Sequence, residues 1–155
     1  MKATSADLWI GYPGTQSVNF GRTIGPDVEM RLRMNPGIAA VEPYVWVDGD
    51  WRSGGPNTAT AGGVSIYLSG IATANDALMF DKVLPPWQRQ LLREPGAVIV
   101  DRADLASLSV HEGDVAWINN HKVRIVAATE GLRGLGGVNV IASLSTAREI
   151  AGLRD

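Results

Sequence analysis

The sequence predicts a domain of the α+β class, because its periodic segments are of two kinds. Apolar and polar residues alternate at Val64–Ile71 and at Lys122–Val126, which is the period of half-buried strands. Helix-forming stretches occur at Val28–Met34 and Trp87–Glu94. With 155 residues, of which 45% are hydrophobic and 19% charged, the chain has the size and composition of one globular domain.

The N-terminal part is predicted to hold a strand and then a helix. Ala6–Tyr12 is the strand candidate, and a polar, glycine-punctuated loop follows it. Val28–Met34 alternates like a strand, but Pro26 and Asp27 suit the first turn of a helix. The residues between them are good helix formers, so a helix is the preferred interpretation, ending at residues 35–37 (Asn-Pro-Gly).

Two more strands are expected before residue 72. Ile38–Val47 is predicted to be the first of them, ended by the turn sequence Asp48-Gly49-Asp50 before Trp51. Ser53–Gly63 has no apolar period and is rich in small residues, which predicts a mobile loop. Val64–Ile71 alternates and is predicted to be the second strand.

Residues 97–128 are predicted to form a compact β-rich module. Asp101 can cap a helical segment over Arg102–Leu108. Asn119 and Asn120 tolerate the positive φ of a two-residue hairpin turn. The three predicted strands of the module are Ala97–Val100, Val115–Ile118 and Lys122–Val126, and the face expected to be buried carries Val123, Ile125 and Ala127.

A helix precedes this module and a strand and a helix follow it. Trp87–Glu94 is predicted to be a short amphipathic helix opened by two prolines. Val138–Ala142 is the last predicted strand. Thr146 and Glu149 have capping-box spacing for a terminal helix that stops at Gly152.

The segment VIVDRADLASLSVHEGD (98–114), followed by NHKVRIVAATEG (120–131), resembles the periplasmic domain of MacB-type, FtsX-like ABC transporter permeases. In that family a run of the form "vil-s--la--L-v--Gd-v-i-g--v-VvGi" recurs between the first two transmembrane helices. The resemblance extends to ADLWIG (6–11), MNPGIAAVEPYV (34–45) and VNVIASLSTARE (138–149), and so covers most of the chain. The residues that match the family's run are Leu108, Gly113, Asp114, Val123 and Val126.

The resemblance implies a MacB-like periplasmic core within a single extracytoplasmic domain over residues 1–155. Residues 6–71 and 138–152 would form a porter-like βαβ subdomain. A small β-rich subdomain at about 72–137 would be inserted between its two halves. Periodicity alone gives only a mixture of α and β structure.

The function that the resemblance implies is that of a moving, non-catalytic part of an integral membrane protein. Such a domain lies on the periplasmic or extracytoplasmic face of the membrane and transmits ATP-driven conformational change to export or extraction of a substrate. It binds no cofactor, since ATP is used by a separate ATPase subunit or domain. The implied partners are a second permease copy, the cytoplasmic ATPase through the membrane part, and a membrane-fusion (adaptor) protein.

The membrane helices of such a permease are expected to lie outside this chain. No apolar run approaches the ~20 residues that span a bilayer. We therefore expect both ends of the chain to lead into membrane helices and to emerge on the same side of the fold. We also expect the isolated domain to be mainly monomeric.

Charge and composition argue against several classes of function. The formal net charge is −2, and the 14 basic residues are scattered, which gives no reason to expect a nucleic-acid partner. The chain has no cysteine, so disulfides and thiolate metal sites are excluded.

Metal and nucleotide sites have weak support. His111 and His121 would need Glu112 or Asp114 as a third ligand, and their spacing fits no ligand motif, so exposed polar residues are the preferred interpretation. Asp48-Gly49-Asp50 suits a tight turn better than a calcium loop. The glycines of residues 131–137 lack the Lys-Ser/Thr of a phosphate-binding loop, and no nucleophile motif is present, so the chain is not expected to be an enzyme.

Aromatic and arginine side chains are frequent anchors of protein interfaces. Trp9 and Trp46 lie in predicted strands and are expected in the core, whereas Trp117 either faces the core or the flank of the hairpin. Four residues are candidates for a partner interface, although local packing is the preferred, competing interpretation, because most tryptophan is largely buried. They are Trp51, Arg52, Trp87 and Arg89.

Two other classes of protein remain open at this point. A free-standing β-rich ligand-binding module would have a deep, mostly apolar pocket with convergent polar groups. A small hydrolase-type enzyme domain, the less favoured of the two, would have perturbed titratable residues in a cleft, such as His111 with Asp114.

Overall fold

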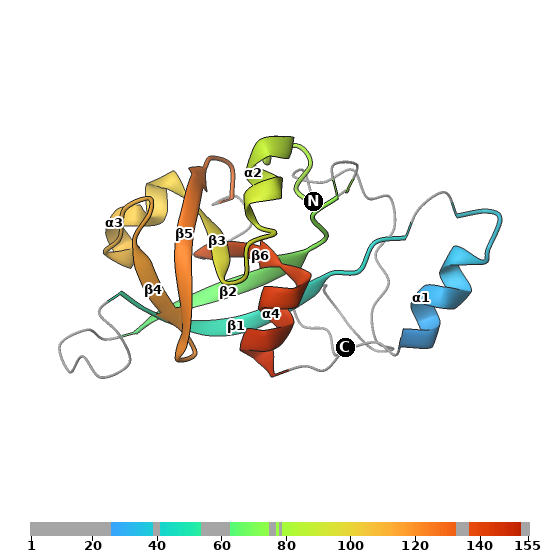
Figure 1. Ribbon diagram of the computed structural model, residues 1–155, viewed down its shortest axis with the longest axis horizontal. Helices are drawn as coiled ribbons and strands as arrows, with labels where there is room; N and C mark the ends of the chain where they lie inside the picture. The colour runs from blue at the N-terminus through green and yellow to red at the C-terminus, as the bar shows by residue number, and fades with distance from the viewer. Residues whose placement is uncertain are drawn as a thin grey trace.

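The computed structural model describes residues 26–38, 41–53, 63–74, 77, 79–132 and 137–152. Within these residues the chain forms a closed β-barrel with the strand order β1-β2-β6-β3-β5-β4 (Figure 1). The strands are β1 Val45–Arg52, β2 Val64–Ile71, β3 Ala97–Asp101, β4 Val115–Ile118, β5 His121–Thr129 and β6 Asn139–Ser143. The helices are α1 Pro26–Arg33, α2 Pro86–Leu91, α3 Leu105–Leu108 after the 3-10 turn η2 Arg102–Asp104, and α4 Leu144–Ala151.

The barrel combines antiparallel strand pairs with two parallel pairs. The antiparallel pairs are β1 with β2, β3 with β6, and β4 with β5. The parallel pairs are β2 with β6, where Tyr67 lies opposite Asn139, and β3 with β5. The ring closes between β1 and β4 through a short antiparallel contact, in which Trp51 faces Ile118 and Arg52 faces Trp117.

Apolar side chains fill the interior of the barrel. Helix α4 closes one side of this core, since Ala147 and Ile150 pack into it. The helix can approach β2 only because Gly70 has no side chain: a Cβ atom there would lie 2.5 Å from the Cβ of Ala147. The strand residues of the interior are Trp51, Ile66, Leu68, Val98, Val100, Ala116, Ile118, Val123, Ile125, Val140 and Ala142.

A second apolar layer lies on the outer face of β3 and β6. Ile99 and Ile141 point outward from these strands and are covered by residues 79–92, which include α2. Both faces of β3 and β6 are therefore buried, and all five residues of each strand are inaccessible to solvent. This explains why the two strands read as continuous apolar runs rather than as alternating ones.

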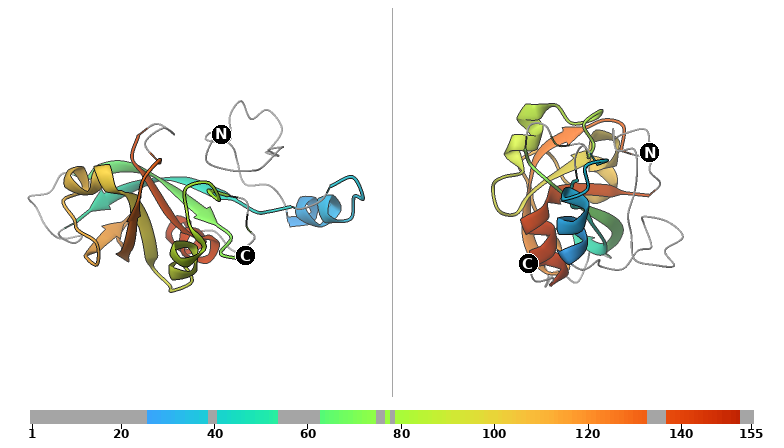
Figure 2. Two further views of the ribbon diagram at one scale, coloured as in Figure 1. Left: turned by 90° about the horizontal axis from the view of Figure 1, so that it is seen from above. Right: turned by 90° about the vertical axis from the view of Figure 1, so that its right-hand side faces the viewer.

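Helix α1 stands away from the barrel, at the right of Figure 1 and in the left-hand view of Figure 2. Its polar side chains pair along the helix, with 2.7 Å between Arg33 and Glu29 and 3.4 Å between Arg31 and Asp27. Met30 is largely exposed. The helix is therefore stabilised by its own (i, i+4) pairs.

The predicted mixed α and β class is confirmed, as are several local predictions. Val64–Ile71 is a strand with the expected bounds. The hairpin turn has positive φ at both Asn119 (50°) and Asn120 (68°). Asp101 accepts a hydrogen bond from the backbone N–H of Ala103 at 2.9 Å and so caps η2. The last helix ends at Gly152, as predicted.

The prediction of a turn at residues 48–50 is wrong, because these residues lie in the middle of β1. Asp48 is exposed on the outside of the barrel, where a carboxylate stays solvated. Gly49 faces inward, and a Cβ atom there would lie 3.0 Å from Cγ2 of Ile118. The glycine is thus required by close packing of the interior rather than by a turn.

The predicted cap of the last helix is also corrected. Ser143 is the N-cap, and its hydroxyl accepts a hydrogen bond from the backbone N–H of Thr146 at 3.1 Å. Thr146 is thus the third residue of the helix, and the capping box begins three residues earlier than predicted. Helix α2 ends at Leu91, three residues before the predicted end.

The strands do not separate into the two subdomains that the resemblance implies. β1, β2 and β6 belong to the proposed porter-like part (6–71 and 138–152), and β3, β4 and β5 to the proposed insertion (about 72–137). All six form one barrel, in which β6 pairs with both β2 and β3. The division into subdomains stays a prediction, and the strand pairing does not support it.

Some predictions lie outside the described residues. These are the strand at Ala6–Tyr12, the placement of Trp9, most of the loop at Ser53–Gly63, and the positions of the two chain ends.

Candidate functional site

The four candidate interface residues divide into two buried and two accessible side chains. Trp51 is 1% exposed, and its indole N–H donates a hydrogen bond to the carbonyl of Leu108 at 3.1 Å. Local packing, the competing interpretation, describes Trp51, because it shares the inward face of β1 with Val47 and Gly49. The side chain ties β1 to the end of α3.

Arg52, the next residue, points to the outside of the barrel. Its Nε lies 3.0 Å from Oδ2 of Asp50 on the same face of β1. Across the closing contact of the barrel Arg52 lies opposite Trp117 of β4. Its side chain is 36% exposed, so it is available to a partner.

Helix α2 exposes two apolar side chains and buries two of its polar ones. Trp87 is 60% and Leu91 38% exposed, one helical turn apart. Gln88 and Arg89, by contrast, are buried against the barrel. An exposed aromatic and aliphatic pair is unusual for a short surface helix and marks a candidate contact surface.

Arg89 acts as an internal link rather than as a surface residue. Its guanidinium donates hydrogen bonds to the carbonyls of Ala72, at 3.0 Å, and of Met79. Burial lowers the pKa of Arg89, and the negative charges of Glu42 and Asp81 act in the opposite direction. The residue holds the chain leaving β2 against α2. Because Arg52 lies at the β1–β4 contact and Trp87 on α2, the accessible two do not form one patch.

An aromatic group lies on the outer face of β1 and β2. Trp46, expected in the core, is half-buried and stacks on Tyr67 with ring centroids 4.9 Å apart. The hydroxyl of Tyr44 lies 3.0 Å from the hydroxyl of Ser69. Burial raises the pKa of Tyr44 to about 12, although the hydrogen bond to Ser69 lowers it.

The histidines do not form a metal site. The His111 side chain is 92% exposed, and its Nδ1 lies 3.6 Å from Oδ2 of Asp114. His121 begins β5 and lies opposite Ile118. No group of three His, Cys, Asp or Glu residues that could hold a metal ion occurs in the part of the chain that the structure describes.

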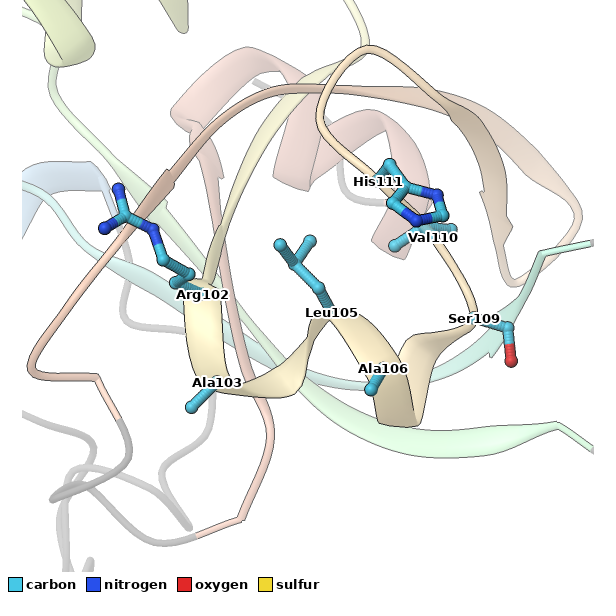
Figure 3. A pocket seen from close by; sticks show the side chains of 7 residues that line it. All are labelled: Arg102, Ala103, Leu105, Ala106, Ser109, Val110 and His111. Carbon is cyan, nitrogen blue, oxygen red and sulfur yellow. The ribbon is translucent and has the colours of Figure 1, made fainter.

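An open hollow lies beside η2 and α3 (Figure 3). Its volume is about 530 Å³, and most of its lining residues are exposed. The hydroxyl of Ser109 and the ring of His111 point in different directions, so they do not form a nucleophile and base pair (Figure 3). The lining residues are Arg102, Ala103, Leu105, Ala106, Ser109, Val110 and His111. This hollow is not the deep apolar pocket expected of a ligand-binding module.

Sequence reasoning missed a surface on the outside of β4 and β5. Val115 and Trp117 are half-buried, whereas the alternating Ala116 and Ile118 are buried inside the barrel. Trp117 therefore faces outward, opposite Lys122 of β5. The signal available in the sequence is the alternation of these two strands. It allows two placements of Trp117, in the core or on the flank of the hairpin, and the structure shows the second.

The described residues contain no helix that is long and apolar enough to cross a membrane.

The described residues form a small mixed α/β domain built on a closed barrel. It is similar to a solved structure, the extracellular domain of the noncanonic ABC-type transporter YknZ from Gram-positive bacteria. The match covers 85% of this chain and 68% of that chain, with a TM-score of 0.58 and 15% sequence identity. At this identity the likeness shows a shared fold, and on that level it agrees with the resemblance found in the sequence. No family model matches the chain, and no curated protein matches it.

Proposed function

We propose that this chain is the extracytoplasmic domain of an ABC transporter permease. In this role it lies on the outer side of the membrane and transmits ATP-driven conformational change to the export or extraction of a substrate. The observation that carries the proposal is the shared fold with a transporter's extracellular domain over 85% of this chain. Whether the transporter is closer to the MacB or the FtsX type is left to experiment.

The residues that match the family's run support this proposal, because each has a structural task in the fold. Leu108 and Val123 fill the barrel interior. Gly113 has a φ of 90°, and its N–H donates to the carbonyl of Ile125 at 2.7 Å. The Oδ2 atom of Asp114 accepts a hydrogen bond from the backbone N–H of His111 at 2.8 Å. Val126 packs against the outer apolar layer. Gly113 and Asp114 specify the turn into β4 and the other three matching residues contribute to packing, so the sequence resemblance and the shared fold support each other.

The proposed partners are a second permease copy, a cytoplasmic ATPase reached through the membrane part, and an adaptor protein. We assign ATP hydrolysis to the ATPase, and no cofactor or catalytic step to this domain. For contact with a partner, the exposed pair Trp87 and Leu91 on α2 offers the apolar anchor. Arg52 is the second accessible candidate, while the burial of Trp51 and Arg89 leaves them structural roles.

The location can be tested by cysteine labelling, because the chain has no cysteine of its own. The substitution Ser107→Cys, on the exposed side of α3, is made in the gene, so that cells produce the whole protein with a single cysteine in this chain. Intact cells are then treated with a membrane-impermeant maleimide. We expect labelling at position 107 and none at the buried control Ala116→Cys, which reports that the domain is folded. Labelling of position 107 only after cell lysis would place the domain in the cytoplasm and overturn the proposal.

Coupling to ATP hydrolysis can be tested with the same chemistry. The labelling rates of Ser107→Cys and Trp87→Cys are compared between cells with an active ATPase and cells with a catalytically inactive one. A moving domain is expected to show a rate change at one of the two positions at least. If each position is labelled at the same rate in both kinds of cell, the domain does not transmit conformational change. The proposed extracytoplasmic location would be unaffected by that result.

A further inference from the structure

We propose that the outer face of β1, β4 and β5 is a docking surface for an acidic, extended segment of a partner protein. The surface is built around Trp117, which lies opposite Arg52 on one side and opposite Lys122 on the other. Arg124 lies opposite Val115 on the same face. We call Arg52, Trp117, Lys122 and Arg124 the basic row. The proposal stands on the chemistry of this surface and does not depend on the proposed transport role.

Strand geometry places the members of the basic row side by side. Residues directly opposite each other on neighbouring strands share a face of the sheet, and the strands lie about 4.8 Å apart. Arg52, Trp117 and Lys122 therefore form a line across three strands, with Trp117 in the middle. The side chains of Lys122 and Arg124 are exposed, and Trp117 is half-buried between Arg52 and Lys122.

Two cations of this row, Lys122 and Arg124, differ from several arginines of the chain in lacking a carboxylate partner among the described residues. Arg31, Arg33 and Arg102 each form an ion pair with an acidic residue. In the described part of the chain neither Lys122 nor Arg124 forms an ion pair.

Acidic residues near the row do not cancel its charge. Arg52 pairs with Asp50, and Asp48 lies on the same outer face of β1 two residues further from the row, so the positive charge open to a partner is that of Lys122 and Arg124. Asp114, at the entrance to β4, is turned toward His111. Residues 54–62, which follow Arg52 in the sequence, contain no acidic residue. A surface with two unbalanced positive charges on a chain of net charge −2 is complementary to an anionic partner.

The shape of the surface favours a protein segment over a membrane. A folded domain binds a lipid surface stably when several cations act together or when apolar side chains protrude and insert between headgroups, and two open cations are few for the first mode. Trp117 is instead half-buried in a sheet face between two longer cationic side chains. A flat tryptophan flanked by arginine and lysine is the composition of a protein interface, where the ring binds an apolar side chain and the cations bind carboxylates.

A peptide titration tests this proposal on the 155-residue chain. The probe is a ten-residue peptide with five glutamates and two phenylalanines, and its control has lysines in place of the glutamates. Binding is followed by NMR through the backbone amides. We expect the acidic peptide to shift Arg52, Trp117, Lys122 and Arg124 with a Kd below about 1 mM, and the basic peptide to shift none of them.

Charge reversal supplies the matched comparison. Lys122→Glu is expected to weaken binding of the acidic peptide by about tenfold or more, since it replaces an attraction by a repulsion. Lys82→Glu makes the same charge change at an exposed lysine outside the row and is expected to leave the affinity within about twofold. Should Lys122→Glu fail to fold, Arg124→Glu replaces it in the same comparison.

Three results would overturn the proposal. The first is the absence of peptide-dependent shifts in the basic row. The second is an equal loss of affinity in Lys82→Glu and Lys122→Glu, which would indicate a general effect of net charge. The third is binding of vesicles made of phosphatidylglycerol and phosphatidylcholine through the same residues without binding of the acidic peptide, which would identify a lipid surface instead.

Discussion

The two sides of the barrel are built from the same kind of strand but meet different surroundings. On one side β3 and β6 are buried on both faces, because residues 79–92 cover their outer surface. On the other side β4 alternates between buried and half-buried residues, and its outer face is open. The comparison teaches that the covered side carries the larger share of the packing, whereas the open side leaves charged and aromatic side chains accessible. Four substitutions test this division of roles.

Ile141→Ala should have the largest effect. Ile141 is fully buried in the outer apolar layer of β6, and truncation of a buried isoleucine lowers the free energy of unfolding by about 2–5 kcal/mol. Lys122→Ala on the open side serves as the control and should stay within about 0.5 kcal/mol. Urea denaturation followed by circular dichroism measures both. Similar losses for the two variants would show that the covered side is not the more stabilising one.

Arg89→Met tests whether hydrogen bonds, as well as apolar contacts, hold the covering segment 79–92 against the barrel. The substitution leaves the carbonyls of Ala72 and Met79 without their donor, which should cost about 1–3 kcal/mol of unfolding free energy. Arg93→Met removes the exposed bond to the carbonyl of Thr73 and should cost less than about 1 kcal/mol. Denaturant unfolding of the two variants measures the two losses of unfolding free energy. If Arg89→Met were the milder change, the cover would be held by its apolar contacts alone.

Ser143→Ala tests the junction between the two sides, since α4 follows β6 and packs against β1 and β2. Loss of the N-cap hydroxyl should lower the free energy of unfolding by about 1 kcal/mol. Ser145→Ala, at an exposed position of the same helix, is the matched control and should be close to neutral. Thermal or urea unfolding measures both variants. Equal losses of unfolding free energy would show that the Ser143 hydroxyl does not stabilise the helix as its N-cap.

Tyr44 gives the smallest expected effect, and it depends on pH. Its pKa is about 12 in the folded protein against 10.0 for the ordinary side chain. Between these values the unfolded chain loses the proton and the folded chain keeps it. Stability should therefore fall as pH rises above 10, by less than about 1 kcal/mol per pH unit from this residue. Below pH 10 its contribution is fully present.

Tyr44→Phe should be less stable than the parent at pH 9, because the hydrogen bond to Ser69 is lost. The gap between variant and parent should narrow between pH 10 and pH 12, since phenylalanine does not ionise. Urea unfolding at pH 9 and pH 11 measures this change. A gap of constant size would contradict the raised pKa of Tyr44.

Local signals in the sequence were sufficient for elements whose partners are near in the chain. Val64–Ile71 alternates, and the Asn119-Asn120 turn joins two strands that pair with each other. Asp48-Gly49-Asp50 misled because the same three residues suit a turn and, with Gly49 pressed against Ile118, also suit a crowded strand. Whether these residues form a turn or a strand depends on β4, whose Ile118 lies about 70 residues further along the chain.

The site was predictable only in part for the same reason. Whether a tryptophan is buried depends on which face of its strand it occupies. The turn predicted at residues 48–50 left Trp51 outside any predicted strand, so its face could not be predicted. In α2 the sequence suggests an amphipathic helix, but the structure buries Gln88 and Arg89, because Arg89 finds backbone carbonyls on the barrel. The basic row gathers residues from β1, β4 and β5, and no local pattern connects Arg52 to Lys122.

The position of β6 has a consequence for the order in which this chain can fold during synthesis. β6 is the last of the six barrel strands to leave the ribosome, yet it lies between β2 and β3 and pairs with both. Until residue 143 has emerged, β2 and β3 each carry a row of unsatisfied backbone groups, which is a hazard for aggregation. The barrel therefore has to close after translation of its full length, in a step governed by distant contacts and expected to be slow. A chain shortened before β6 should consequently be prone to aggregation rather than a smaller folded domain.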